Sequence, residues 1–173
     1  MIMNLRKLVI NSLFLAIGVV LHQITPPIFL GMKPDFSLAM LFIIIIINDD
    51  YKTCISSGII AGLLAAATTT FPGGQLPNII DRIVTTTVIF IALKPLRNKL
   101  NNKIQIIGTT LIGTVISGGV FLGSALIIVG LPASFKALFM AVVLPATIIN
   151  TIVAVIIFLA VQRGKAVVFH TTK

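Results

Sequence analysis

The chain has 173 residues, of which 57% are hydrophobic and only 10% charged, and its mean hydropathy is +1.14. These values exclude a soluble globular domain and indicate an integral membrane protein, because several apolar runs reach the ~17–25 residues that cross a bilayer as a helix. The net charge of +9 does not predict a nucleic-acid partner, since the basic residues are distributed as membrane topology requires.

Short polar or Pro- and Gly-rich breaks divide the chain into six apolar segments. We expect helices at residues 8–24, 36–48, 53–70, 79–95, 104–129 and 136–161. The first is expected to be a membrane helix and not a secretory signal, because LHQITPP follows it in place of a small-residue cleavage site. The second is short and would need its polar flanks or a thinner bilayer to span. Pro145 is expected to kink the last. The sequence therefore predicts an all-α integral membrane protein, with residues 1–173 as a single domain of six transmembrane helices.

Basic residues mark one side of the predicted membrane. That side collects Arg6, Lys7, Lys52, Lys94, Arg97, Lys99, Lys103, Arg163, Lys165 and Lys173. The other side carries only Lys33, Arg82 and Lys136. Because cytoplasmic loops hold an excess of Lys and Arg, both termini are expected in the cytoplasm, which agrees with an even number of spans. The basic connector LKPLRNKLNNK is expected to be solvated near the lipid headgroups, without a chemical role.

Three Pro- and Gly-rich segments face outward on this topology: TPPIFLGMKPD, FPGGQLPNIIDR and VGLPASFK. In the second, residues 72–74 (PGG) predict a tight turn. Asn78 and Asp81 then have the spacing of a capping box, so a helix is expected to begin directly after Asn78. Arg82 would lie beside that helix start, where free amides and the positive end of the helix dipole favour an anion.

The outward segments carry charges of both signs, which suits a zwitterionic ligand. The candidate binding residues are Lys33, Asp35, Phe71, Gln75, Asn78, Asp81, Arg82 and Lys136. Arg82 is the expected carboxylate partner, with Lys33 or Lys136 as alternatives, and Asp81 or Asp35 would take the ammonium group.

Gln75 and Asn78 would add polar contacts, while aromatic side chains would wall a flat apolar group. The aromatic candidates are Phe29, Phe36, Phe71, Phe135 and Phe139. Local roles would explain many of the same residues: a helix start, an arginine reaching the headgroups, interfacial charges and an aromatic belt.

Other polar and small residues predict contacts between helices. Asn150 lies in the middle of a span, and it is expected to bond to another helix in preference to a ligand. His22 is expected to bond to a loop carbonyl. The row from Gly58 to Gly62 predicts close helix packing within the chain, and Gly119 and Gly123 predict the same for their helix.

The sequence lacks the common catalytic and nucleotide-binding motifs. It contains no P-loop, HExxH motif, GxSxG elbow or acidic cluster suited to two metals, and its two His residues are far apart. No enzymatic activity, cofactor or metal is therefore expected.

Five segments carry a resemblance to a known family: AIGVVLH, GMKPD, FPGGQLPNIIDR, GLPASFKALF and VVLPATIINTI. On them the chain resembles the tryptophan transporter family of S-components, the substrate-binding membrane subunits of energy-coupling factor (ECF) transporters. The resemblance implies a six-helix bundle in the bacterial plasma membrane that captures L-tryptophan beneath the loops after helices one, three and five. It also implies partners: a transmembrane coupling subunit and two ATPase subunits. Ser12 and Ala16 stand where S-components carry an AxxxA row for docking to the coupling subunit.

Two alternative functions remain open at this point. The chain could be a stand-alone transporter driven by protons or sodium, with His22, Asp35 or Asp81 as the coupling group. It could also be a membrane scaffold that only contacts partner proteins through its small-residue helix faces.

Overall fold

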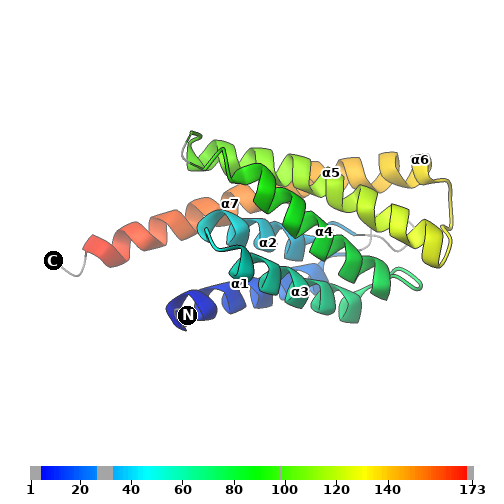
Figure 1. The fold of residues 1–173 in the computed structure, drawn as a ribbon, viewed down its shortest axis with the longest axis horizontal. Coiled ribbons are helices and arrows are strands. Elements are labelled where there is room, and N and C mark those ends of the chain that lie inside the picture. The colour runs from blue at the N-terminus through cyan, green and yellow to red at the C-terminus, as the bar shows by residue number, and fades with distance from the viewer. Residues whose placement is uncertain (1–4, 27–32, 98, 171–173) are drawn as a thin grey trace.

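The computed structural model describes residues 5–26, 33–97 and 99–170, and all regular structure within them is helical (Figure 1). The elements are α1 (Leu5–Ile24), α2 (Phe36–Ile47), α3 (Tyr51–Thr68), α4 (Gln75–Leu93), α5 (Asn102–Ile128), α6 (Phe135–Leu138), the π-helical η1 (Phe139–Val143) and α7 (Leu144–His170). The last three follow one another without a break and form a single helix. The predicted all-helical fold is therefore confirmed.

The helices run back and forth along the long axis of the molecule (Figure 1). At one end α1, α3 and α5 finish and α2, α4 and α6 begin, and we call this the outer end. At the opposite end α1 begins and α7 ends, and α4 is followed there by α5. This arrangement agrees with an even number of crossings and with the predicted sidedness of the basic residues. Five helices, α1, α3, α4, α5 and the one that starts at Phe135, are long and apolar enough to cross a membrane.

The sixth helix, α2, is short because it does not face lipid. Its 12 residues span about 18 Å, well below the ~30 Å of a bilayer core. Residues 39–45 have no exposed surface, and α2 contacts α1, α3, α4, α5 and α7. A helix that is apolar on every side suits such a central position. Neither lengthening nor a thinner bilayer is needed, and the short central helix leaves room for a pocket at the outer end.

Arg97 covers the inner end of α2. Its guanidinium donates to the carbonyl oxygens of Ile45 at 2.8 Å and Ile46 at 3.3 Å, and it pairs with Asp49 at 2.6 Å. It also lies 5.3 Å from the centre of the Phe90 ring. Since the last carbonyls of a helix lack partners within the helix, Arg97 satisfies groups that would otherwise be buried and unpaired. The prediction that this connector is solvated is wrong for Arg97, whose side chain is only 14% exposed.

The start of α4 differs from the prediction. The tight turn is confirmed, since Gly74 N donates to Phe71 O at 3.0 Å and Gly73 has a φ of 71°. The capping box is wrong, because α4 begins at Gln75 and its N-cap is Gly74, without a side-chain cap. Pro77 falls in the first turn, where a missing N–H costs nothing. Asn78 therefore lies inside the helix, and its side chain donates to Gly74 O at 2.8 Å.

The helix that contains Pro145 changes its geometry just before the proline. Residues 139–143 form the π-helical segment η1, and Leu144 N donates to Phe139 O five residues earlier. Proline has no N–H to donate, and a π-helical turn is one of the known ways to absorb such a break. The irregularity expected at Pro145 thus takes the form of a π-helical turn.

Glycines let α3 pack closely on α4, as predicted. A Cβ atom at Gly58 would collide with the Thr86 side chain, and one at Gly62 would lie 3.2 Å from Arg82 Cβ. The same prediction is wrong for Gly119 and Gly123, where an added Cβ would meet no described atom within 4 Å. The close approaches on α5 are at Gly113, which faces the Phe42 ring of α2, and at Gly118, which faces the Val143 side chain of η1.

Candidate functional site

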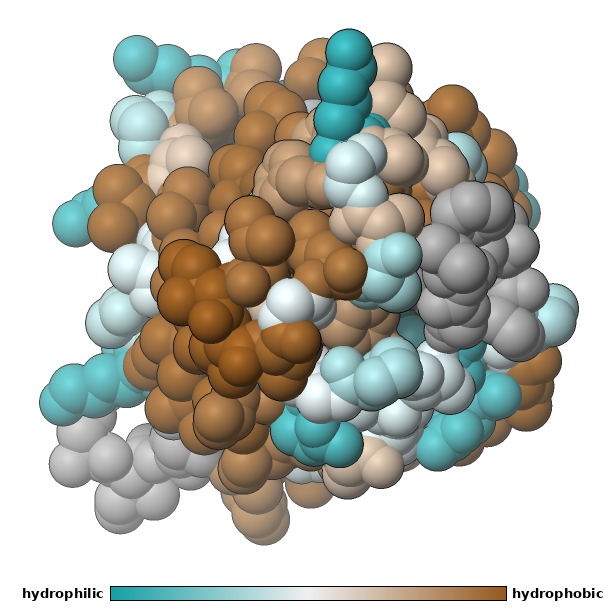
Figure 2. All heavy atoms as spheres, turned by 90° about the vertical axis from the view of Figure 1, so that its right-hand side faces the viewer, coloured by the Kyte–Doolittle hydropathy of each residue, from teal (hydrophilic) through white to brown (hydrophobic). Residues whose placement is uncertain are grey.

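A pocket lies at the outer end of the bundle, above the start of α2. It encloses about 700 Å³ of unfilled space when the open solvent at its mouth is included. Its walls come from all the long helices, from η1, from the segment before α2 and from the α3–α4 turn. Figure 2 looks onto this end, where polar residues gather on one side of the face and apolar residues on the other.

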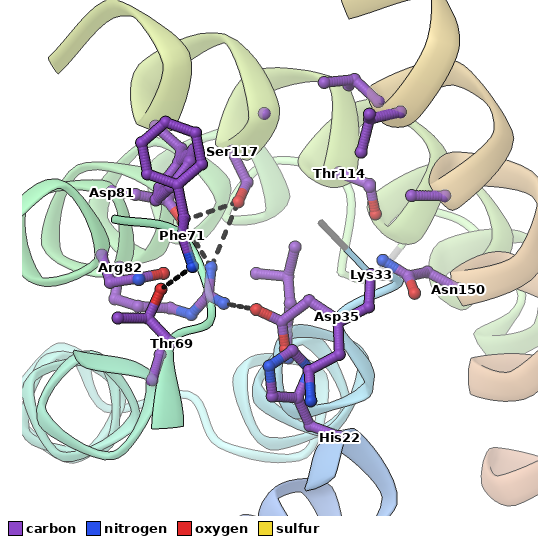
Figure 3. Close-up of a pocket in the computed structure, with 18 of the residues that line it drawn as sticks. His22, Lys33, Asp35, Thr69, Phe71, Asp81, Arg82, Thr114, Ser117 and Asn150 are labelled. Carbon is purple, nitrogen blue, oxygen red and sulfur yellow. Dashed lines mark hydrogen bonds and ion pairs between the residues drawn. The ribbon is translucent and has the colours of Figure 1, made fainter. Parts of the chain in front are cut away.

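One side of the pocket is a buried ionic cluster of Asp35, Asp81 and Arg82 (Figure 3). The Arg82 side chain is 1% exposed and pairs with Asp35 through Nη2 and with Asp81 at 2.5 Å through Nη1. Ser117 donates to Asp81 at 2.8 Å, and Thr85 does the same at 2.8 Å. Buried charges are stable only when paired and hydrogen-bonded, and this cluster satisfies both carboxylates. It joins α4 and α5 to the start of α2.

Asp35 is the more accessible of the two carboxylates. Its side chain is 21% exposed, against 2% for Asp81. Asp35 is also the N-cap of α2, where it accepts from Leu38 N at 3.1 Å and from Ser37 Oγ at 2.5 Å. His22 Nδ1 lies 3.2 Å from the Pro34 carbonyl oxygen and 3.6 Å from Asp35 Oδ1. The predicted bond from His22 to a loop carbonyl is confirmed.

Lys33 is the remaining cation of the pocket lining. It forms no ion pair with any described residue, whereas Arg82 pairs with two carboxylates. With both carboxylates ionised, Asp35, Asp81 and Arg82 carry one net negative charge, which Lys33 balances. Among the described residues, Lys33 is thus a cation of the pocket lining that can meet an anionic group.

The side across from the ionic cluster is mainly apolar. It includes Val142, Val143 and Ala146. Two aromatic rings also line the pocket, and Phe121 meets Phe71 edge-on at 5.4 Å between ring centroids. Two polar side chains interrupt this side, Thr114 of α5 and Asn150 of α7 (Figure 3). Neither has a hydrogen-bond partner among the described residues. The predicted bond from Asn150 to another helix is therefore wrong.

The structure brings most of the predicted site residues together. The pocket is lined by Lys33, Asp35, Phe71, Asn78, Asp81 and Arg82, but not by Gln75 or Lys136, both of which are exposed. Arg82 lies seven residues after Gln75, so it is not beside the first amides of α4. Among the other aromatic candidates, Phe36, Phe135 and Phe139 do not line the pocket, and Phe29 lies outside the described residues.

Sequence reasoning missed several lining residues. These are Thr69, Thr114, Ser117 and Phe121. Asn150 also lines the pocket, although the sequence favoured a bond to another helix. A polar residue inside a span is itself a signal of a functional position, and it could have identified Thr114 and Ser117. Among the described residues, no three His, Cys, Asp or Glu side chains gather as metal ligands.

Fold and pocket define a multi-pass membrane protein of the transporter type, because ionisable residues inside a bundle are costly and mark substrate pathways. Sequence comparison gives the family. Residues 4–165 match the family model described as "Tryptophan transporter TrpP", so the chain belongs to this family. It is a tryptophan transporter family member of the bacterial plasma membrane, as predicted, and family membership supports a transporter and not an enzyme.

Three relatives are each named "Probable tryptophan transport protein". The protein from Clostridium acetobutylicum is 76% identical over 97% of this chain and 98% of its own. The one from Bacillus subtilis is 48% identical over 92% of each chain, and the one from Clostridium perfringens is 46% identical over 93% of each. No solved structure matches the chain.

Proposed function

We propose that the pocket at the outer end binds L-tryptophan from outside the cell, and that the chain delivers it inward as the substrate-binding subunit of an ATP-driven ECF complex. One observation carries the ligand assignment: a pocket that holds a partly exposed carboxylate and a lysine without an ion pair among the described residues is also lined by apolar and aromatic side chains. An amino acid with a large aromatic side chain needs charged partners for its backbone groups and apolar contacts for its ring. Family membership and the names of the relatives support tryptophan as that amino acid.

The charged side would hold the backbone groups of the amino acid. Lys33 is better suited to the carboxylate than Arg82, because Arg82 is buried and already paired with two acidic side chains. Asp35 is better suited to the ammonium group than Asp81, because it retains exposed surface toward the pocket. In this assignment Arg82 and Asp81 position Asp35 without touching the ligand.

The apolar side would hold the indole ring. Phe71 and Phe121 meet at the pocket and can pack against a flat ring. Asn78 lines the same pocket, but its side-chain amide group already bonds to Gly74 O, which leaves its oxygen as the free polar atom. It would contribute a hydrogen-bond acceptor near the aromatic wall.

The ATP-driven mechanism rests on the resemblance to ECF S-components and on the lack of a nucleotide-binding motif in the sequence. The small residues Ser12 and Ala16 are both exposed on α1, so they are accessible to a coupling subunit. A face of small residues lets a second helix approach closely in a membrane.

The mechanism predicts that tryptophan uptake depends on separate ATPase subunits. Cells that express the chain with an ECF module should accumulate radiolabelled tryptophan, and cells that lack the ATPase subunits should not. A protonophore should have little direct effect while ATP is maintained. Uptake that survives loss of the ATPase subunits but collapses with the protonophore would instead support the stand-alone transporter, with His22, Asp35 or Asp81 as the coupling group.

Replacing Lys33 by Ala should weaken tryptophan binding roughly tenfold, because one charge-assisted hydrogen bond to the carboxylate is lost. Isothermal titration of the detergent-purified protein would measure this change. Lys136→Ala is the matched control, since Lys136 is an exposed lysine at the same end that does not line the pocket. Equal binding by the parent and Lys33→Ala would refute the carboxylate assignment.

A further inference from the structure

Asn150 is the most unusual polar residue of the bundle. Its side chain is 1% exposed, yet neither its amide nitrogen nor its oxygen has a partner among the described residues. A buried polar group without a partner costs about 1–3 kcal/mol, and native proteins rarely leave both ends of an amide unpaired. A group of this kind therefore requires an explanation.

Neighbours on the same helix show that the absence of a partner is specific to this position. Thr147 donates to Val143 O at 2.7 Å, and Thr151 donates to Thr147 O at 2.7 Å. Each of these hydroxyls donates a hydrogen bond to the backbone carbonyl four residues earlier in the same helix, as Thr commonly does in membrane helices. Asn150 lies between them and has no such bond, although it faces the pocket.

The surroundings of Asn150 define what it could meet. It lines the pocket beside the apolar side chains of Ala146 and Val143, and it lies across the pocket from Arg82 and Asp81 (Figure 3). Thr114, on the facing helix α5, adds a hydroxyl that also has no partner among the described residues. A ligand whose charged groups meet the ionic side would thus place its ring among apolar atoms and next to one unpaired amide.

We propose that Asn150 is a specificity-determining residue whose side-chain oxygen accepts a hydrogen bond from the indole N–H of bound tryptophan. The inference rests on the proposed function. It adds the contact by which the pocket would distinguish an indole ring from other aromatic rings. A site built to bond a ligand N–H rejects an analogue that lacks it, because the polar group of the site is then left buried and unpaired. Apolar contacts alone would discriminate poorly between rings of similar size.

The test compares two ligands of nearly the same shape on the detergent-purified full chain. L-Tryptophan and L-benzothienylalanine differ in that sulfur replaces the indole N–H. By isothermal titration we expect the parent to bind tryptophan at least roughly tenfold more tightly than the sulfur analogue, the value of one lost hydrogen bond. Asn150→Leu, of similar size, should bind both ligands with nearly equal affinity.

Two further variants separate specificity from structural damage. Thr151→Val changes a neighbouring polar residue of α7 that does not line the pocket, so it should keep the parent ratio of affinities. Thr114→Val removes the unpaired hydroxyl of Thr114 and should lower the ratio less than Asn150→Leu does. A general loss of folding would reduce binding of both ligands together and would leave their ratio unchanged.

The outcomes also separate this inference from the proposed function. If the parent binds tryptophan and the sulfur analogue equally, the role of Asn150 is refuted while tryptophan binding stands. If Asn150→Leu keeps the parent ratio, the role is refuted as well. If the parent binds neither ligand, the proposed function fails and the inference fails with it. The comparison of ligands on the parent needs no variant, so poor folding of Asn150→Leu cannot prevent the test.

Discussion

Arg82→Met is expected to destabilise the protein by about 3–5 kcal/mol, the usual cost of removing one partner from a buried ionic group. Asp35 and Asp81 would lose their shared cation, and Asp81 would stay almost fully buried with only Ser117 and Thr85 as partners. Thermal unfolding in detergent, monitored by circular dichroism, would measure the change. Intrinsic tryptophan fluorescence is not an option because the chain contains no Trp. Met fills a similar volume, so the effect reports the lost charge more than a cavity.

The companion variants show whether charge pairing is the cause. A triple variant, Asp35→Asn, Asp81→Asn and Arg82→Met, removes all three charges. It should recover part of the stability that Arg82→Met alone loses. Gln75→Met changes an exposed polar residue of the same helix and should be close to neutral. An Arg82→Met protein that unfolds at the parent temperature would contradict the ionic cluster as a stabilising element.

Gly58→Val is expected to cost about 1–3 kcal/mol, or more if α3 and α4 must separate. A Cβ at this position would already collide with the fully buried Thr86, and valine adds two further methyl groups. Because Gly62, one turn along the same face, packs against Arg82 Cβ, a shift of α3 would also disturb the ionic cluster. Tryptophan affinity should therefore fall together with the unfolding temperature.

Gly119→Val provides the matched control on α5. It makes the same substitution in a membrane helix, at a glycine where an added Cβ meets no described atom within 4 Å. Its effect should be small or slightly stabilising, since valine has a better helix propensity than glycine. Equal destabilisation by both variants would show that helix propensity, and not the close contact of α3 with α4, governs the result.

The short α2 links the fold to the site. Because other helices surround it, it can begin well inside the bundle, and its N-cap residue Asp35 then lies at the floor of the pocket. The capping role holds Asp35 by two local hydrogen bonds, while Arg82 holds it from α4. A carboxylate fixed from two elements is preorganised for a cationic group of a ligand.

Several features were predictable because they depend on composition and on local order. Hydropathy determined the membrane class and the number of helices, and the distribution of Lys and Arg predicted the orientation. The turn at Gly73 and Gly74 follows from residue type alone. The location of Asp35 and Arg82 at the same end of the bundle followed from the order of the predicted spans.

Only the tertiary structure decided which of these residues meet. Asp35 and Arg82 are 47 residues apart, and no local pattern indicates that they form an ion pair. Because they do, Lys33 is left without an ion pair among the described residues of the pocket. The burial of α2 and the pocket-facing position of Asn150 were equally hidden. A helix that is apolar on nearly every side carries no periodic signal for the direction it faces, so packing against its neighbours determines that direction.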